Sequence, residues 1–314
     1  MTATTDKSLA MVFPGQGSQS VGMLADLAAN NPQVGETFDA ASDALQYDLW
    51  KLVQEGPEAE LNQTDRTQPA MLAAGVSVWR VWQANNGAVP AVMAGHSLGE
   101  YTALVCAGAH DFDTAVALVA ARGRCMQDAV PPGVGAMAAL LGLDDDTVAD
   151  VCMRAAEGEV VEPVNFNSPG QVVIAGNASA VERAIALSVE AGARRAVTLP
   201  VSVPSHCALM KPAAEIFAQQ LEQTQFTQPV IPVVQNVDGV MQDQPAMIRD
   251  NLGKQLYSPV QWVRSVQTMH AHGVTRMLEA GPGKVLAGLC KRIDKRIASA
   301  SVYDPDTLAA ALAG

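Results

Sequence analysis

The most informative stretch of this sequence is VPAVMAGHSLGEYTALVCA, residues 89–107. Its first part, 89–94, is a short apolar run bounded by proline and glycine, and its last part, 100–107, has the composition of a helix start. Between them lies the pentapeptide Gly95-His96-Ser97-Leu98-Gly99. Where a strand leads into a helix, a Gly-x-Ser-x-Gly pentapeptide forms a sharp turn that exposes the serine hydroxyl above the sheet edge. The stretch therefore predicts an α/β fold with Ser97 as a nucleophile.

Predicted strands and helices alternate on both sides of this turn. An apolar strand at 9–13 runs into a glycine-rich loop, which opens a helix near Val21. The strand at 89–94 and the sharp turn after it, which we call the elbow, are followed by helices at 101–107 and 113–130. Beyond residue 200 the sequence predicts helix 210–222, strand 230–236, helix 262–272, strand 276–279 and a helix from about Gly283. This alternation is typical of a parallel sheet covered by helices.

The alternation is interrupted once, after Pro131-Pro132-Gly133. Residues 133–200 read as strand, helix, two strands, helix and strand, which is the order of a ferredoxin-like unit. Ser179 is followed three residues later by Glu182, which predicts a capping box at the second helix. We therefore expect an inserted small unit at 133–200.

Composition excludes several classes of protein. The chain has 314 residues, of which 49% are hydrophobic and 17% charged, as expected of a soluble globular enzyme. A net charge of −12 argues against nucleic-acid binding. No run approaches about 18 apolar residues, and 1–8 is polar, so we expect a cytoplasmic protein without a membrane segment. The five cysteines are widely spaced, and they indicate neither disulfides nor a metal site.

A serine hydroxyl needs a neighbouring base, and the chain has five histidines as candidates. His110 lies too near the elbow helix to fold back, and His270 and His272 are two apart on a predicted helix and face different directions. His96 adjoins the nucleophile on a tight turn, which favours structural support. His206 ends an extended segment at 200–206, where α/β enzymes place functional groups, although a loop histidine with a structural role remains the alternative.

Five motifs occur together, in one order, along nearly the whole chain. They are Phe13-Pro14-Gly15-Gln16-Gly17-Ser18-Gln19, Gly95-His96-Ser97-Leu98-Gly99-Glu100, Arg122-Gly123, Asn165-Phe166-Asn167-Ser168-Pro169-Gly170-Gln171 and Val203-Pro204-Ser205-His206. Together they resemble the malonyl-CoA:acyl carrier protein transacylase family, with no departure at these positions. The resemblance implies an α/β-hydrolase-like catalytic subdomain formed by 1–132 and 201–314, with the ferredoxin-like subdomain at 133–200.

The resemblance also implies roles for individual residues. Ser97 would be the acylated nucleophile and His206 its base, while the backbone of Gln255 would orient His206. Gln16 and the Leu98 amide would form the oxyanion-hole region. The glycine-rich loop around Gln16 is no dinucleotide site, because its pattern lacks the third glycine and no acid follows a second strand at the expected distance.

Arg122 would clamp the malonyl carboxylate. Burying that carboxylate in a protein of net charge −12 requires a fixed counter-charge, and a planar guanidinium offers a two-pronged match. A solvated arginine is the alternative, since Arg124 lies close by. Asn165 and Asn167 could line the cleft, although Asn-Ser-Pro-Gly is equally good turn chemistry.

A basic segment stands out against the acidic background, because residues 284–296 carry a net charge of +4. Lys291 and Arg292 are candidates for docking an acidic carrier protein, the partner that the family uses. The alternative is a solvated helix end with cations near its C-terminus.

The resemblance implies transfer of a malonyl group from the coenzyme A thioester to the phosphopantetheine thiol of acyl carrier protein, through a malonyl-serine ester. The predicted pathway is fatty acid or polyketide biosynthesis, without metal or redox cofactor, by a monomer. One alternative is a serine hydrolase such as a thioesterase; hydrolases of this fold usually place an acid between Ser and His, and none can be singled out here. The other is a catalytically silent binding module, which the intact Ser, His and Arg set argues against.

Overall fold

The computed structural model describes residues 4–201 and 203–314. Its larger sheet has the strand order β10-β9-β1-β2-β7-β8, and every pairing is parallel except that of β8 with β7. The strands are β1 (Thr5–Phe13), β2 (Val89–Gly95), β7 (Val233–Val234), β8 (Met241–Gln242), β9 (Arg276–Ala280) and β10 (Ala298–Val302). The alternation of β and α elements thus forms the parallel sheet that the sequence predicts.

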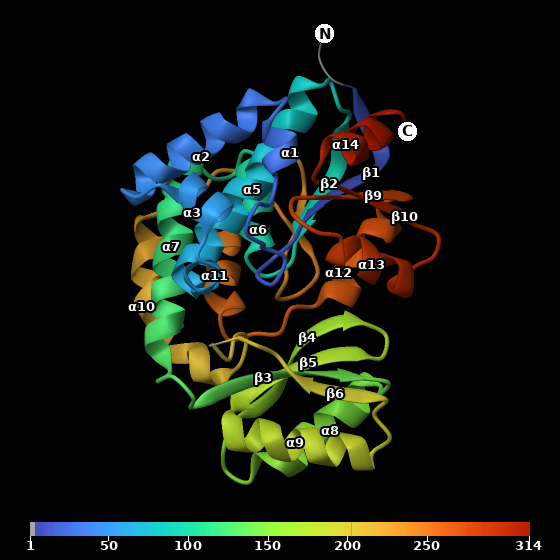
Figure 1. The fold of residues 1–314 in the computed structure, drawn as a ribbon. Coiled ribbons are helices and arrows are strands. Elements are labelled where there is room, and N and C mark those ends of the chain that lie inside the picture. The colour runs from blue at the N-terminus through green and yellow to red at the C-terminus, as the bar shows by residue number, and fades with distance from the viewer. Residues whose placement is uncertain (1–3, 202) are drawn as a thin grey trace.

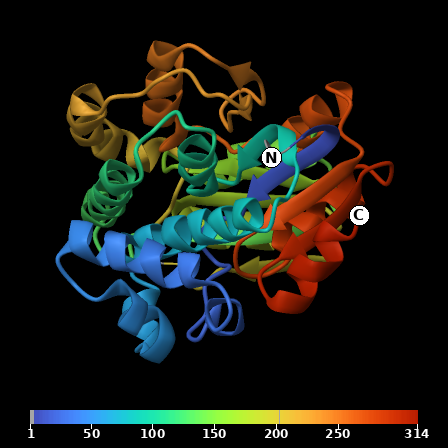
Figure 2. The ribbon, with the colours of Figure 1, turned by 90° about the horizontal axis from the view of Figure 1, so that it is seen from above.

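Helices cover both faces of this sheet (Figures 1 and 2). The side chains of β1 alternate: Leu9, Met11 and Phe13 join the core beneath the larger helix layer, and Ala10 and Val12 join the core beneath α12 and α13. The helices around the sheet are α1 (Ala25–Ala28), α2 (Pro32–Leu45), α3 (Leu49–Glu55), α4 (Glu58–Leu61), α5 (Thr64–Ala84), α6 (Gly99–Cys106), α7 (Phe112–Ala129), α10 (Lys211–Gln223), α11 (Pro245–Gln255), α12 (Trp262–Ala271), α13 (Val285–Ile293) and α14 (Pro305–Leu312), with a 3-10 turn η1 (Ala208–Met210).

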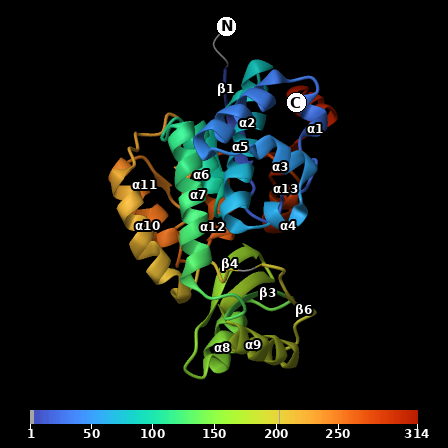
Figure 3. The ribbon, with the colours of Figure 1, turned by 60° about the vertical axis from the view of Figure 1, so that its left-hand side comes forward.

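The second sheet is antiparallel, with the order β4-β5-β3-β6. It comprises β3 (Gly135–Leu141), β4 (Val161–Ser168), β5 (Gln171–Asn177) and β6 (Arg195–Thr198), with α8 (Asp145–Ala156) and α9 (Ala178–Glu190). Both helices lie on the face turned away from the large subdomain (Figures 1 and 3). Ala138 and Leu140 pack toward these helices, and Met137 packs on the opposite face. This βαββαβ arrangement beside the parallel sheet confirms the predicted fold class.

Backbone hydrogen bonds join the two subdomains at the strand β4. The Phe166 N–H donates to the Val260 carbonyl at 3.0 Å, and the Val260 N–H donates to the Val164 carbonyl at 2.9 Å. Val260 belongs to the segment between α11 and α12. A strand of the small sheet is thereby tied to the large subdomain, which holds the two units against each other.

Several local predictions are wrong. The first helix begins at Ala25, after turns, rather than near Val21, and strand 230–236 shortens to β7, because prolines such as Pro232 have no N–H for a sheet ladder. The capping box does not form: Asn177 is the N-cap of α9, and Ser179 Oγ instead donates to the Glu159 carboxylate at 2.8 Å. A tertiary contact has replaced the local one.

Several elements were not predicted from the sequence: the strands β8 and β10, the helices α11 and α14, and the 3-10 turn η1. In α11 the buried positions include the polar Asn251 and Gln255, so apolar periodicity is weak there. Of the helices in the described ranges, none combines the length and apolar character needed to cross a membrane.

Candidate active site

Ser97 lies at the turn between β2 and α6. Its φ is 51°, in the left-handed region that non-glycine residues seldom adopt. The flanking glycines are required by space: a Cβ on Gly95 would collide with the Gly99 backbone, and a Cβ on Gly99 would collide with the Phe13 carbonyl. The pentapeptide therefore folds as the tight elbow that the sequence predicts, with β1 pressed against it.

Asn236, two residues after the end of β7, holds this strained turn. Its Oδ1 accepts a hydrogen bond from the Ser97 N–H at 2.6 Å, and its Nδ2 donates to the Gly95 carbonyl at 2.7 Å. The Asn236 side chain is fully buried. The sequence analysis missed this residue, although a polar residue that ends an apolar strand of a parallel sheet is a signal that could have found it.

His206 lies directly against the predicted nucleophile, with its Nε2 2.8 Å from Ser97 Oγ. Its Nδ1 lies 2.7 Å from the backbone carbonyl of Gln255. A carbonyl oxygen only accepts, so Nδ1 carries the proton and Nε2 is free to accept from the serine hydroxyl. The ring is 3% exposed, and this burial, with the nearby Arg122 charge, lowers the pKa of His206 to about 3. The imidazole is therefore neutral, as a general base must be.

The extended segment predicted to end at His206 is wrong at that end. His206 lies in a turn with φ 67°, and its N–H donates to the Leu256 carbonyl at 2.9 Å. Ser202, within the same predicted segment, lies outside the described residues. The carbonyl groups at the end of α11, those of Gln255 and Leu256, thus fix the ring and the backbone of the histidine, which local sequence signals do not reveal.

Arg122 projects from α7 toward the same hydroxyl. Its Nη2 donates to Ser97 Oγ at 3.4 Å and to Gln255 Oε1 at 3.0 Å, and its Nη1 donates to Gln68 Oε1 at 2.9 Å. The side chain is only 1% exposed, and burial lowers its pKa. Within residues 4–201 and 203–314 no carboxylate lies within ion-pair distance of it. A buried cation without an ion pair suits an anionic substrate.

A cavity of about 110 Å³ opens onto these groups. Its lining includes Gln16 and Leu98, next to the serine, the histidine and the arginine. Among the described residues, no acceptor pairs with the backbone N–H of either Gln16 or Leu98, and the Gln16 side chain donates to Thr64 Oγ1 at 3.4 Å. The structure thus brings together Gln16, Ser97, Leu98, Arg122 and His206, with Gln255 directly behind them.

The small subdomain completes the wall of the cavity. Asn165 lines it, and its buried Oδ1 has no partner in the described ranges. Asn167 Oδ1 instead lies 2.8 Å from His96 Nε2. His96 is therefore held by a residue of the small subdomain, in line with structural support. Burial lowers the pKa of His96, so its ring is neutral beside the serine.

The other predicted and rejected residues lie elsewhere. Lys291 and Arg292 are exposed in the last turn of α13, and Arg292 Nη1 donates to Gln171 Oε1 of β5 at 2.6 Å. Arg292 therefore spans the seam between the subdomains. His110 is buried against Phe226, and His270 Nδ1 lies 3.1 Å from the Val274 carbonyl, so neither reaches the cavity.

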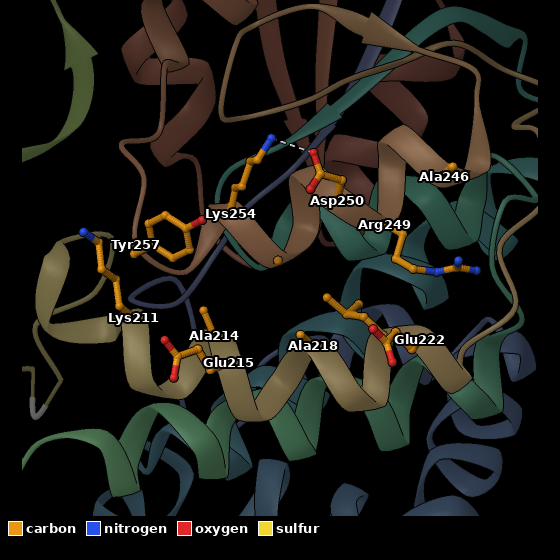
Figure 4. A pocket seen from close by; sticks show the side chains of 12 residues that line it. Lys211, Ala214, Glu215, Ala218, Glu222, Ala246, Arg249, Asp250, Lys254 and Tyr257 are labelled. Atoms are coloured by element: carbon orange, nitrogen blue, oxygen red, sulfur yellow. Dashed lines mark hydrogen bonds and ion pairs between the residues drawn. The ribbon is translucent and has the colours of Figure 1, made fainter.

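A larger groove runs between α10 and α11 and is lined by residues of both helices (Figure 4). Both signs of charge line it, and Lys254 Nζ pairs with the Asp250 carboxylate at 2.6 Å. It contains none of the predicted site residues, and those predicted for catalysis and substrate binding line or adjoin the smaller cavity instead. The described part of the chain has no cluster of three or more His, Cys, Asp or Glu side chains that could hold a metal ion.

Comparison with known proteins places this geometry in a family. The model of the acyl transferase domain matches residues 10–304. The malonyl CoA-acyl carrier protein transacylase of Escherichia coli (strain K12) is 60% identical over 303 residues, which make up 96% of this chain and 98% of that protein.

Solved structures agree with this assignment. The crystal structure of an acyl carrier protein S-malonyltransferase from Vibrio cholerae superposes with a TM-score of 0.95 at 60% identity, covering 96% of this chain and 99% of that one. A malonyl-transacylase in complex with a type II PKS acyl-carrier protein superposes with a TM-score of 0.96 at 56% identity, covering 98% and 99%. The chain therefore belongs to the acyl transferase family and, within it, to the malonyl CoA-acyl carrier protein transacylases.

Proposed function

We propose that this protein transfers the malonyl group of malonyl-CoA to the phosphopantetheine thiol of acyl carrier protein, in fatty acid or polyketide biosynthesis. The observation that carries the proposal is the convergence of three side chains on one atom. Ser97 Oγ lies 2.8 Å from His206 Nε2 and 3.4 Å from Arg122 Nη2. A nucleophile, a neutral base and a buried cation next to each other suit a thioester whose acyl group ends in a carboxylate.

In the first half-reaction, Ser97 Oγ attacks the thioester carbonyl while its proton passes to His206 Nε2. The carbonyl oxygen becomes an oxyanion, for which the backbone N–H groups of Gln16 and Leu98 are the proposed donors. Collapse of the tetrahedral intermediate breaks the C–S bond; the imidazolium gives its proton to the leaving sulfur, so that coenzyme A departs as a thiol and a malonyl-serine ester remains. The Gln255 carbonyl, 2.7 Å from Nδ1, supports the imidazolium without a carboxylate.

Arg122 is the proposed ligand of the malonyl carboxylate. Its Nη1 and Nη2 are held by the side chains of Gln68 and Gln255, at 2.9 and 3.0 Å, so the guanidinium is fixed before substrate arrives. A fixed guanidinium pairs with a carboxylate through two parallel hydrogen bonds. A neutral acyl group gains nothing from it, so the cation favours malonyl over acetyl.

In the second half-reaction the phosphopantetheine thiol of the carrier protein attacks the malonyl-serine ester, with His206 again accepting a proton and returning it to Ser97 Oγ. Both steps exchange a thioester for an ester or the reverse, without a change of oxidation state, so the reaction needs no redox cofactor. The exposed cations of α13, Lys291 and Arg292, are the proposed contact for the acidic carrier.

The proposal is tested by intact-mass measurement. The protein is mixed with malonyl-CoA and then with holo acyl carrier protein, and we expect a malonyl adduct on the enzyme that moves to the carrier. Ser97→Ala should abolish the adduct, because it removes the hydroxyl that lies 2.8 Å from His206 Nε2. A folded Ser97→Ala variant that still accumulates the adduct would show that the nucleophile is another residue. Loss of the adduct to water, with an unmodified carrier, would identify a thioesterase instead.

A further inference from the structure

Glu100 is a fully buried carboxylate in the first turn of α6, three residues after the predicted nucleophile. Its Oε2 accepts hydrogen bonds from the Gln255 Nε2 at 2.8 Å and from the Asn236 N–H at 2.9 Å. These two donors come from α11 and from the segment after β7, far from Glu100 in the sequence. A buried charge is costly unless something is gained from it, so the reason for this carboxylate lies in what it holds.

The first partner leads to the guanidinium. The Gln255 side chain uses its Nε2 to bind Glu100 and the Ser97 carbonyl, at 2.8 and 3.1 Å, and so turns its Oε1 toward Arg122 Nη2 at 3.0 Å. An amide can be rotated so that oxygen and nitrogen exchange places, and here the partners on both sides oppose this rotation: two acceptors on the nitrogen side and the guanidinium, which can only donate, on the oxygen side. Glu100 provides the shorter of the two hydrogen bonds on the nitrogen side and so helps to keep an oxygen, rather than an N–H₂ group, facing the guanidinium.

The second partner leads to the elbow. The N–H of Asn236 is fixed by Glu100, and the side chain of the same residue clamps the Ser97 N–H at 2.6 Å and the Gly95 carbonyl at 2.7 Å. One carboxylate oxygen thus joins the residue that orients the cation to the residue that clamps the nucleophile turn.

The negative charge of Glu100 also stabilises the buried positive charge of Arg122. The guanidinium is 1% exposed, and within the described ranges its hydrogen bonds go only to neutral oxygens, those of Gln68, Gln255 and Ser97. The side-chain amide of Gln255 lies between the guanidinium and Glu100 and forms a hydrogen bond with each of them. Burial raises the pKa of Glu100 to about 7, while its hydrogen bonds and the Arg122 charge favour the anion. Its position lets it offset the cation without occupying the face of the guanidinium that a substrate needs.

We infer that Glu100 is a positioning residue for malonyl recognition, which acts through the Gln255 amide to hold the Arg122 guanidinium toward the acyl group bound at Ser97. The inference rests on the proposed function, since it assigns Arg122 to the malonyl carboxylate. Glu100 itself touches neither substrate nor the reacting atoms.

The test measures acylation of the enzyme by malonyl-CoA and by acetyl-CoA separately, as kcat/KM for the first half-reaction. Glu100→Ala should lower the malonyl value by roughly ten- to a hundredfold relative to the acetyl value, the scale of a misplaced hydrogen bond to a charged group. Acetyl transfer depends on Ser97 and His206 but not on the cation. Glu100→Gln retains an acceptor oxygen for both donors and should recover most of the lost selectivity.

Glu279 supplies a matched control for loss of a buried carboxylate. It is also fully buried, and its Oε2 accepts the Ala287 N–H at 2.8 Å, at the start of α13 and away from the cavity. Glu279→Ala should lower the melting temperature but leave the malonyl-to-acetyl ratio unchanged. If Glu100→Ala lowers the melting temperature and reduces both substrates equally, its role is only structural and the inference is wrong.

A double-mutant cycle separates the route through Arg122 from all others. In an Arg122→Ala background, Glu100→Ala should have almost no further effect on the malonyl-to-acetyl ratio, because the group it positions is gone. An additive effect would overturn the inference. If Arg122→Ala alone leaves the ratio unchanged, the proposed function fails at the carboxylate clamp; a ratio that responds to Arg122→Ala but not to Glu100→Ala refutes only the role of Glu100.

Discussion

At the scale of single residues, the arrangement differs from a serine hydrolase triad in its third member. A backbone carbonyl, that of Gln255, takes the place of an aspartate at 2.7 Å from His206 Nδ1. A carbonyl fixes the tautomer and the ring orientation as a carboxylate does, but it adds no full negative charge. Burial, together with the nearby Arg122 charge, keeps the pKa of His206 low, at about 3. The site therefore lacks the negative charge that a triad aspartate would place beside the histidine, and the proposed substrate carries a carboxylate of its own.

Replacing His206 tests this reasoning about the base. His206→Ala should slow acylation of Ser97 by roughly 10²- to 10⁴-fold, the usual contribution of a positioned general base. In the wild-type enzyme, kcat/KM for the first half-reaction should show no titration of this histidine between pH 8 and pH 5, because its pKa of about 3 keeps it neutral throughout. Stopped-flow or quenched-flow acylation measures both quantities. A fall in rate with a midpoint near pH 6.5 that is absent from the alanine variant would contradict the assigned pKa.

Replacing Arg122 tests the cation. Arg122→Ala should cost roughly 1.5 to 3 kcal/mol in kcat/KM for malonyl-CoA, the usual worth of a hydrogen bond to a charged group. Acetyl-CoA should not be penalised, since it has no carboxylate to pair. Arg124 lies two residues along the same helix and is exposed, so Arg124→Ala is the matched control. Equal losses for malonyl and acetyl would mean that Arg122 supports the structure rather than specificity.

At the scale of elements, α13 lies at the seam between the two subdomains. It belongs to the large subdomain and contacts β4 of the small sheet, which contributes Asn165 to the cavity. Of its two exposed cations, Arg292 is used in part to hold Gln171, whereas Lys291 has no ion-pair partner in the described ranges. The helix thus combines an internal contact with a charge that a partner can reach.

Charge reversal on α13 separates docking from chemistry. Lys291→Glu with Arg292→Glu should slow transfer from malonyl-enzyme to carrier protein, and the defect should shrink as added salt screens the charges. The first half-reaction should be spared. Two controls apply: Gln171→Ala removes the contact to Arg292 without changing charge, and Lys211→Glu reverses an exposed charge at the start of α10, a helix that lies apart from α13 (Figure 3). An equal loss in both half-reactions would place the carrier elsewhere.

At the scale of the whole molecule, burial of ionisable groups makes the stability depend on pH in two opposite directions. Burial lowers the pKa of His206 to about 3 and that of His110 to about 4. Between these values and the ordinary histidine pKa, the two histidines are therefore protonated in the unfolded chain but neutral in the folded one. Burial raises the pKa of Glu100 to about 7, so the folded chain keeps a proton that the unfolded chain releases. The first effect destabilises the fold at acid pH and the second at neutral and alkaline pH.

The pH dependence of unfolding checks this balance. For each of the two histidines, stability should fall as pH decreases below about 6.5, with a slope approaching 1.4 kcal/mol per pH unit and group. For Glu100 the sign is reversed, because its contribution is present below about pH 4.5 and is lost as pH rises through 7. Denaturant unfolding from pH 5 to pH 8 should therefore show that Glu100→Gln gains stability relative to wild type as pH rises. A difference independent of pH would show that Glu100 does not titrate in this range.

The sequence alone determined the fold class and the chemical groups. The pentapeptide at 95–99 specifies its own turn, since the space beside Gly95 and Gly99 admits no side chain, and the βαββαβ order specifies the small sheet. These are local properties, because they depend on the size of individual residues and on the spacing of apolar residues along the chain. Five motifs in one order then indicated the family that the comparisons confirm.

Only the tertiary structure decided how the polar groups connect. Asn236, Gln68 and Glu100 reach the elbow and the guanidinium through hydrogen bonds between residues far apart in the chain, and neither helical nor strand periodicity records such contacts. The same reason explains the errors. Ser179 does not cap α9 as predicted but donates a hydrogen bond to Glu159. His206 lies in a turn rather than in an extended segment, and its N–H donates to the Leu256 carbonyl. His206 is buried, and a buried polar group takes the partner that the folded chain brings to it, because leaving it without one costs more than local preference supplies.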